Sequence, residues 1–427
     1  MADRSNLPLI AGAALLIVIL LAAGYFFLAG GGEEAETGTP TKEAETTPQG
    51  GAEEEEKVRV LVLFDVGGRG DLSFNDMAAL GADRAAEELG VEVDFQTPKS
   101  VDLMPSLLES VSKTGEYDLI VLVGFLWQKP LEEVAPKYPE QKYALIDAAP
   151  AEPLDNVAAF LFREQEVASL VGILAADMAR NIGLKTGEEA KAGAVAGMYI
   201  PPLWRFHIGY LFGVQYYNKA TGSNIEMVWT YTGAFDDVAL GKQTAETMLQ
   251  RGVRVFYGVA GLTHVGMFDA VREASGRGII AFSIGQDASQ EWYHPETIIV
   301  SGLKRVDTAV FTAIKMVVEG RFEGGIHSLG LKEGGLGISD EEMIRFFAEI
   351  AAEQGRLPEG LTPDDVVRIV MEKREEWISD EAWQLVEELE AKIASGEIRF
   401  VTPMTGDEYE AIIEELKNGN LDAALEK

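Results

Sequence analysis

The sequence predicts an α/β protein of two similar lobes, each a parallel sheet sandwiched by helices. From residue 58 onward, short and continuously apolar runs alternate with helix-like patterns, and a second series of the same kind follows the first. Continuous apolar strands with helices between them are typical of a parallel sheet covered on both faces. Two such series in a chain of 427 residues predict two lobes with separate cores.

The two series are expected to form the two lobes in order. The first has predicted strands at 58–64, 91–95, 118–123, 143–146 and 157–161, with helices at 76–89, 103–113 and 131–137. The second has predicted strands at 192–196, 226–231, 255–259 and 279–284, with helices at 166–179, 203–217 and 236–251 and one more that ends at 274.

The remaining chain is expected to return to both lobes. A strand at 298–304 and a helix to 319 should rejoin the first lobe, and a strand at 326–331 the second. A charged helical segment at 340–394 and a last short strand at 398–402 follow. The hinge should then be crossed near 162, 285 and 322, giving lobe I as 58–162 and 286–321 and lobe II as 163–285 and 322–427.

Composition narrows the classes of partner. The chain has 36 Lys and Arg against 70 Asp and Glu, a net charge of -34, which disfavours nucleic acid and anionic lipid surfaces. It has no Cys, which excludes disulfides, thiolate metal sites, Cys nucleophiles and a lipid-modified cysteine. So acidic a surface suits a halophile and a thermophile equally.

The amino end predicts a membrane anchor. Leu9 to Ala29 is a run of 21 residues without charge, long enough to span roughly 31 Å at about 1.5 Å per residue. Arg4 precedes it and three Glu follow it, so residues 1–30 should form a transmembrane helix with the bulk of the chain outside the cell. A cleaved secretory signal is the alternative, with small residues at 22–24 or 29–30.

Residues 31–57 should form a disordered acidic linker. The segment contains nine Glu and no aromatic or branched aliphatic residue, so it cannot bury a core.

A polar loop follows the first predicted strand. Asp71-Leu72-Ser73-Phe74-Asn75 comes after a glycine-rich turn at 67–70 and directly before a helix. It should lie at the carboxyl edge of the sheet, where loop side chains and helix N-terminal N–H groups converge on ligands. The alternative is that Asp71, Ser73 or Asn75 simply caps the helix.

Nine motifs in order resemble those of the basic membrane protein family of solute-binding proteins, which is similar to the purine nucleoside receptor lipoproteins that feed ABC transporters. They are 71–75; 117–120 with Gly124 and Phe125; 143–147; 162–166; 197–201 with Phe206 and Gly209; 231–237 with Gly241 and Lys242; Ala260 and Gly261 with Gly266; 285–287 with Gln290; and Ser301 with Lys304 and Asp307. The resemblance implies a two-lobed type I periplasmic-binding-protein fold that closes over its ligand.

The resemblance also implies roles for single residues. Asp71 and Asn75 would hydrogen-bond a base, and Phe206 would stack on it with Phe74 or Phe125 nearby. Asp287 would accept from ribose hydroxyls and Lys304 would donate to the sugar. Ser73, Asp147 and Gly261 complete the implied ligand-binding set. Each of the principal residues has a structural alternative: Phe206 as core, Asp287 as a helix cap, Lys304 as a solvated helix start.

The sequence departs from the family pattern at four points. The family usually has an aromatic residue at the position of Ala79 and a second Asp at the position of Ser289. The lipid-bearing cysteine is absent, so the apolar run at 9–29 would replace it. The helical segment 340–394 is longer than the family leads us to expect. The first departure leaves purine specificity open, because one wall of the base site would be missing.

Other classes of function find less support. The turn Gly68-x-Gly70 lacks the third glycine of a dinucleotide fingerprint, because Ser73 stands there. The four His at 207, 264, 294 and 327 lack metal-ligand spacing. A ligand-sensing ectodomain is an alternative. Fewer than ten residues precede the anchor, so we expect no signalling domain on the inner side of the membrane.

We therefore expect a monomeric extracellular solute-binding protein of an ABC importer. It would have no catalytic residue, cofactor or metal and would bind a nucleoside, with a purine favoured. A sugar or other small polar solute is the alternative ligand, and the permease is not identified by the sequence.

Overall fold

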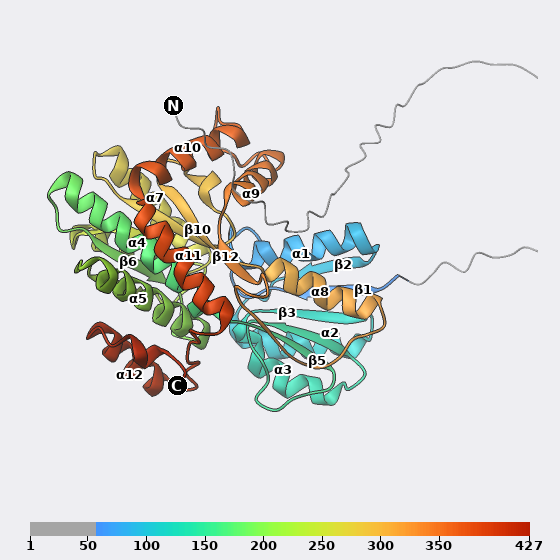
Figure 1. Cartoon of the computed structure of the whole chain (residues 1–427). Helices are drawn as coiled ribbons and strands as arrows, with labels where there is room; N and C mark the ends of the chain where they lie inside the picture. Colours follow the sequence, from blue (N-terminus) through green and yellow to red (C-terminus); the bar gives the residue numbers. More distant parts are fainter. Residues whose placement is uncertain (1–56) are drawn as a thin grey trace, which may run out of the picture. The chain divides into compact units, whose positions relative to one another are not determined.

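The computed structural model describes residues 57–427, and the predicted anchor and almost all of the linker lie outside this range. The described chain forms two α/β lobes, each built on a six-stranded sheet (Figure 1). Their strand orders, β11-β5-β4-β3-β1-β2 and β12-β10-β9-β8-β6-β7, follow one pattern, as two similar series of strands and helices predict. The two-lobed α/β architecture is therefore confirmed.

The first sheet is parallel throughout. Its strands are β1 (Arg59–Leu63), β2 (Glu92–Gln96), β3 (Leu119–Val123), β4 (Lys142–Ile146), β5 (Val157–Phe162) and β11 (Gly325–Leu329). The helices α1 (Phe74–Leu89) and α8 (Val306–Val318) pack together, as do α2 (Met104–Thr114) and α3 (Gln128–Val134). Alternate residues of β1 enter two different cores, Val60 and Val62 with α1 and Leu61 and Leu63 with α2, so helices cover both faces.

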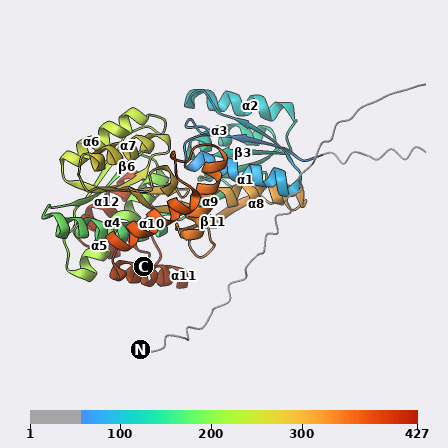
Figure 2. The same ribbon diagram turned by 90° about the horizontal axis from the view of Figure 1, so that it is seen from above.

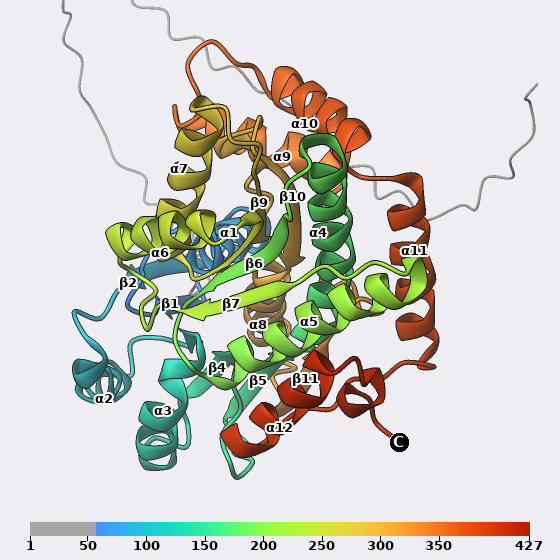
Figure 3. The same ribbon diagram turned by 90° about the vertical axis from the view of Figure 1, so that its left-hand side faces the viewer.

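The second sheet repeats this plan with one antiparallel edge strand. Its strands are β6 (Lys191–Ala196), β7 (Met227–Tyr231), β8 (Val253–Val259), β9 (Phe282–Asp287), β10 (Ile298–Lys304) and the antiparallel β12 (Leu336–Ile338). The helices α4 (Glu164–Thr186) and α5 (Pro201–Thr221) pack together, as do α6 (Val238–Gln250) and α7 (Leu262–Gly276). Figure 3 shows this lobe facing the viewer.

Two predicted returns are wrong. The strand at 298–304 was expected in the first lobe, but β10 pairs with β9 in the second sheet. The strand at 326–331 was expected in the second lobe, but β11 pairs with β5 in the first. The chain therefore crosses between lobes after β5, after β10 and between β11 and β12, rather than near 285 and 322. A short strand fits either sheet by its sequence, so only pairing decides its place.

The carboxyl-terminal chain covers the second lobe. It forms α9 (Glu341–Glu353), α10 (Pro363–Trp377), α11 (Asp380–Ser395) and α12 (Gly406–Lys417). α11 packs on α4 and α12 on α5, and Figures 1 and 2 both show these red and orange helices around that lobe. The short strand expected at 398–402 is wrong: Phe400 makes only an isolated bridge to Leu425.

Among the described helices, α4 alone is long and apolar enough to cross a membrane, and 78% of its apolar window is buried inside the protein. Three glycines explain how closely it packs against α5. A Cβ atom on Gly172 would lie 2.3 Å from the Tyr210 carbonyl oxygen, and one on Gly213 would lie 2.0 Å from that of Ser169. Gly209 meets Gln165 in the same way. The backbones of α4 and α5 therefore touch along the core of the second lobe.

Gly213→Ala should lower the free energy of unfolding by about 1–3 kcal/mol, because the new methyl group forces α4 and α5 apart. Gly276→Ala is the matched control, since its Cβ would meet nothing within 4 Å at the end of α7. That control should be neutral or stabilising by up to about 1 kcal/mol. Equilibrium urea denaturation measures both, and equal stability of the two variants would contradict the packing described.

Candidate functional site

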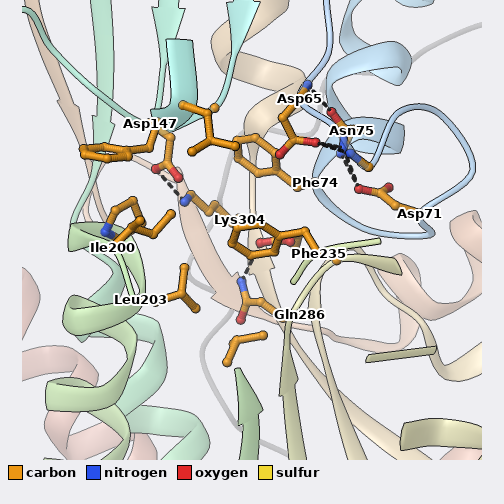
Figure 4. Close-up of a pocket in the computed structure, with 18 of the residues that line it drawn as sticks. Asp65, Asp71, Phe74, Asn75, Asp147, Ile200, Leu203, Phe235, Gln286 and Lys304 are labelled. Atoms are coloured by element: carbon orange, nitrogen blue, oxygen red, sulfur yellow. Dashed lines mark hydrogen bonds and ion pairs between the residues drawn. The ribbon is translucent and has the colours of Figure 1, made fainter. Parts of the chain in front are cut away.

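A cleft lies between the carboxyl ends of the two sheets, and both lobes line it (Figure 4). The first lobe contributes Asp65, Gly67, Asp71, Phe74, Asn75, Gly124, Phe125, Leu126 and Asp147. The second contributes Ile200, Pro202, Leu203, Phe206, Phe235, Val259, Gly261, Gln286, Asp287 and Lys304. Concave, largely apolar clefts with a few convergent polar groups are typical sites for small molecules.

The Asp71 carboxylate spends all its hydrogen-bond acceptor positions on the loop that carries it. One carboxylate oxygen accepts from the backbone N–H groups of Ser73 and Asp76, at 2.9 and 3.1 Å. The other accepts from the backbone and side-chain N–H groups of Asn75, at 2.9 and 3.0 Å. A carboxylate has about four acceptor positions, so none remains for a ligand. Asp71 therefore caps the helix, as the structural alternative for this loop predicts. Burial raises the pKa of its carboxyl group to about 7.

Asp65 at the end of β1 has a free oxygen where Asp71 has none. Its Oδ1 accepts from the Gly67 N–H at 2.9 Å and from the Asn75 amide at 2.8 Å. Its Oδ2 has no hydrogen-bond partner among residues 57–427 and lies beside Gly124 at the cleft. Burial raises the pKa of this carboxyl group.

Aromatic side chains from both lobes form the apolar walls. Phe74 and Phe125 come from the first lobe, and Phe206 and Phe235 from the second. Phe206 is 4% exposed and makes an edge contact with Tyr257 at 6.2 Å between ring centroids. Phe206 is therefore a core residue, as its structural alternative predicts, and it also forms part of the cleft wall.

Lys304 is the only cation that lines the cleft among the described residues, and it is 1% exposed. Its ammonium donates to Asp147 Oδ1 at 2.6 Å and to Glu164 Oε1 at 2.9 Å. The buried Arg205 donates to Glu164 Oε2 at 2.5 Å from behind. The rings of Phe74, Phe162 and Phe206 also surround the ammonium at 5.0–5.5 Å. Lys304 is thus a paired interior cation and not a solvated helix start.

The two carboxylates that bind Lys304 differ in basicity. Burial raises the pKa of Asp147 to about 7, although Lys304 opposes the shift. Burial acts in the same direction on Glu164, but Arg205 and Lys304 outweigh it and lower that pKa to about 2. Glu164 therefore carries the permanent negative charge of this group, and Asp147 is the carboxylate that can gain a proton near neutrality.

Asp287 of the second lobe also makes a contact between the lobes. Its Oδ2 accepts from the Ser73 hydroxyl of the first lobe, and its Oδ1 accepts from the Gln286 amide at 3.0 Å. Asp147 and Asp287 end equivalent strands of the two lobes, and both have a φ of 74°. Non-glycine residues in this region are strained, and such strain clusters at ligand sites.

The structure brings together nearly all residues expected at the site. Ser73 is the exception: it does not line the cleft but donates to Asp287 and to the Gln286 carbonyl. Ala79 is buried in the core of the first lobe and does not line the cleft. Ser289 donates to Glu291 at 2.6 Å and also lies outside the cleft.

Sequence reasoning missed other lining residues. Asp65, Leu203, Phe235 and Gln286 carried no predicted role, although Phe235 and Gln286 stood inside quoted motifs. The sequence contained a signal for Phe235, because this aromatic residue follows Gly233 in the loop after the predicted strand at 226–231. Within residues 57–427, no group of three His, Asp or Glu side chains is arranged to hold a metal ion.

The chain matches the family model described as ABC transporter substrate-binding protein PnrA-like (Bmp) over residues 58–354. It is 58% identical over 374 residues to a Pyrococcus furiosus protein described as an uncharacterized lipoprotein, covering 87% of this chain and 92% of that one. It is 33% identical over 306 residues to basic membrane protein A1 of Borrelia garinii subsp. bavariensis, covering 70% and 85%.

Solved structures of solute-binding proteins are also similar to this chain. An ABC transporter solute-binding protein of Aeropyrum pernix K1 is 78% identical, with a TM-score of 0.86 over 86% of this chain and 100% of that chain. A solute-binding protein of Conexibacter woesei shares the fold at 19% identity and a TM-score of 0.56, covering 81% and 99%. The chain belongs to the PnrA-like family of ABC transporter substrate-binding proteins, as the nine motifs predict.

Lys304→Met should make stability depend more steeply on pH. The variant leaves Asp147 buried without the cation that lowers its pKa, so the folded pKa should rise above about 7 while the unfolded value stays near 3.8. A folded state that holds its proton to higher pH loses stability as the pH rises through that window. Urea denaturation between pH 6 and 9 should show this slope continuing above pH 7, where that of the wild type levels off, in addition to a loss of about 3–5 kcal/mol at neutral pH.

The double variant Asp147→Asn with Lys304→Met removes the titrating carboxyl group and should abolish the added slope. If the single and double variants lose stability with pH alike, Asp147 is not the group that Lys304 controls.

Proposed function

We propose that this family member closes its two lobes over a nucleoside, with a purine favoured, and delivers it unaltered to an ABC permease. The observation that carries the proposal is the pairing of aromatic walls with carboxylates from both lobes in one buried cleft. A sugar or another small polar solute is the second candidate, because the same carboxylates would accept its hydroxyl groups. A ligand-sensing ectodomain would use the same cleft.

The aromatic walls favour a flat ring. Phe74 and Phe125 of the first lobe line the cleft together with Phe206 and Phe235 of the second, and Figure 4 labels Phe74 and Phe235. A planar base between them would bury both of its faces, and each aromatic contact contributes about 0.5–1.5 kcal/mol beyond its buried area. A sugar alone would gain less from four aromatic rings.

The polar groups suit a base at one end and a ribose at the other. Asp65 Oδ2 is the free acceptor for a base N–H group, and it takes the role that the family resemblance gave to Asp71. Asn75 retains one acceptor position on Oδ1, which otherwise accepts from the Asp65 N–H at 3.3 Å. Asp287 retains acceptor positions for ribose hydroxyls, and Lys304 lies on the same side of the cleft.

The charge of the cleft favours a neutral solute. Four carboxylates line it, those of Asp65, Asp71, Asp147 and Asp287. Lys304 is the single cation that lines it within residues 57–427, and Glu164 and Asp147 already neutralise its charge. A phosphate group would add negative charge to a buried and already acidic site. We therefore expect nucleosides to bind and nucleotides to be rejected.

We also propose that residues 1–30 hold the protein at the outer face of the membrane. The Pyrococcus furiosus relative is described as a lipoprotein, whereas this chain has no cysteine to carry a lipid. The uncharged run from Leu9 to Ala29 would serve in its place.

Isothermal titration calorimetry tests the ligand. Inosine, guanosine or adenosine should bind, ribose should bind far more weakly, and the matching nucleoside monophosphate should not bind measurably. Phe206→Leu should weaken nucleoside binding by up to about tenfold through lost stacking and should leave ribose binding almost unchanged. Phe212→Leu is the matched control, because Phe212 lies on the same helix but packs against Phe400 outside the cleft.

Absence of binding by all three nucleosides would refute the ligand assignment. Equal losses for nucleoside and ribose in Phe206→Leu would instead favour a plain sugar site.

Amino-terminal sequencing of protein extracted from membranes tests the anchor. Uncleaved chains should begin at or next to Met1, and sequences that begin within residues 23–56 would show a cleaved signal instead.

A further inference from the structure

Leu72 of the first lobe packs into an apolar cluster that lies outside that lobe. It lies between Asp71 and Ser73, is 6% exposed and has a φ of 58°. A leucine adopts this left-handed backbone conformation only when its surroundings hold it there. Neither the cleft nor the core of the first lobe contains its side chain.

The Leu72 side chain belongs to an apolar cluster formed by the second lobe and the carboxyl-terminal helices. Its other buried members, which we call the Leu72 socket, are Val265, Trp292, Ile344, Ala348, Ala351, Val366, Val367 and Val370. Ile344, Ala348 and Ala351 lie on α9, and the last three lie on α10. A loop of the first lobe is therefore inserted into a core that the carboxyl-terminal helices build.

Hydrogen bonds fix the backbone of Leu72 on both sides. Its carbonyl oxygen accepts from the buried Gln290 amide of the second lobe at 2.8 Å. Its N–H donates to Asp76 Oδ2 at 2.9 Å within the first lobe. The neighbouring Ser73 hydroxyl binds Asp287 across the cleft. The insertion of Leu72 and the closure of the cleft thus involve consecutive residues.

Arg356 makes a second contact between the carboxyl-terminal segment and the first lobe. This residue follows α9, lies over the Trp292 ring at 5.4 Å and pairs with Asp76 at 3.8 Å. An open cleft between α1 and α9 is lined by Met77, Leu80, Phe347 and Ile350, and Leu72 and Arg356 line it as well. Leu72 and Arg356 thus connect the first lobe with the region of α9.

The socket is fixed to the second lobe. Arg374 of α10 is 5% exposed and donates to the Ile299 carbonyl at 2.6 Å, to the Ser339 carbonyl at 2.8 Å and to Glu291 at 3.1 Å. Breaking such a buried group would leave unpaired charges, so α10 should move with β10 as one body. Figures 1 and 2 show α9 and α10 on the second lobe, with α9 on the side of α1.

We propose that Leu72 is a positioning residue: seated in the socket, it holds Asp71 and Ser73 at the cleft and couples the carboxyl-terminal helices to closure of the lobes. Opening the lobes would withdraw Leu72 and expose both its side chain and the socket to water. The closed state is then stabilised by burial of apolar surface outside the ligand site, and α10 lies beyond the part of the chain that the family model matches. The proposal rests on lobe closure in the proposed function but not on the identity of the ligand.

The test measures the distance between the lobes. Because the chain has no cysteine, Ser110→Cys on α2 and Gln250→Cys on α6 place two nitroxide labels at exposed positions on opposite lobes. Double electron–electron resonance then gives the populations of the open and closed states. The labelled full chain is measured as purified, after unfolding and refolding to remove retained solute, and with a mixture of inosine, guanosine and adenosine.

Leu72→Ala should lower the ratio of closed to open molecules by roughly tenfold to a hundredfold, as loss of a buried leucine predicts. Arg356→Ala should lower it less, because exposed pairs contribute little. Leu72→Met keeps the volume and should retain the wild-type distribution. Arg345→Ala is the matched control, since Arg345 lies on α9 but pairs only with Glu341 and Asp364.

Identical distance distributions for wild type and Leu72→Ala in all three conditions would overturn the proposal, provided that circular dichroism shows both to be folded. Equal shifts in Leu72→Ala and Arg345→Ala would also overturn it, because any damage to α9 would then suffice. If the nucleosides change nothing while Leu72→Ala still opens the purified protein, the coupling stands and the nucleoside assignment fails.

Discussion

The cleft depends on the burial of one cation. Lys304 ends β10 at a point where the chain crosses from one lobe to the other, and an ammonium group in the interior costs several kcal/mol unless charges neutralise it. The neutralising carboxylates come from two places, Asp147 at the end of β4 and Glu164 at the start of α4. Neutralising the charge of Lys304 therefore requires the carboxyl ends of both sheets to meet.

This constraint separates the groups that hold the cleft from those that are free to bind. Glu164 and Asp147 together neutralise Lys304 and Arg205, and the Asp71 carboxylate accepts from N–H groups in the first turn of α1. Free acceptor capacity remains on Asp65 and Asp287, at the edges of the aromatic walls. A neutral, flat and hydroxyl-bearing solute satisfies these groups together, whereas an anion meets an acidic site with a cation that is already paired.

The alternation of apolar runs with helical patterns was enough to predict two α/β lobes and most of their elements. It could not assign β10 and β11 to their sheets, because a strand of five or seven residues is compatible with either sheet. The structure shows that each lobe instead takes its sixth strand from the returning chain. α12 was not predicted either, since its apolar positions are few among its charges.

The candidate site was predicted largely through family resemblance, and the structure adds what a motif cannot contain. A motif names Asp71 but does not tell that every lone pair of its carboxylate is occupied, which only the loop conformation shows. Asp65 was missed because an acidic residue before a glycine-rich turn resembles ordinary turn chemistry. Leu72 stood inside the motif without a role, because its partners lie more than 190 residues away in sequence.

The central claim is that the cleft between the lobes binds a neutral nucleoside. Native mass spectrometry of protein purified without unfolding tests it most directly. We predict one bound molecule per chain whose mass, after release in denaturant, is that of a nucleoside. Release of a phosphorylated compound, a peptide or a plain sugar as the main species would contradict the claim.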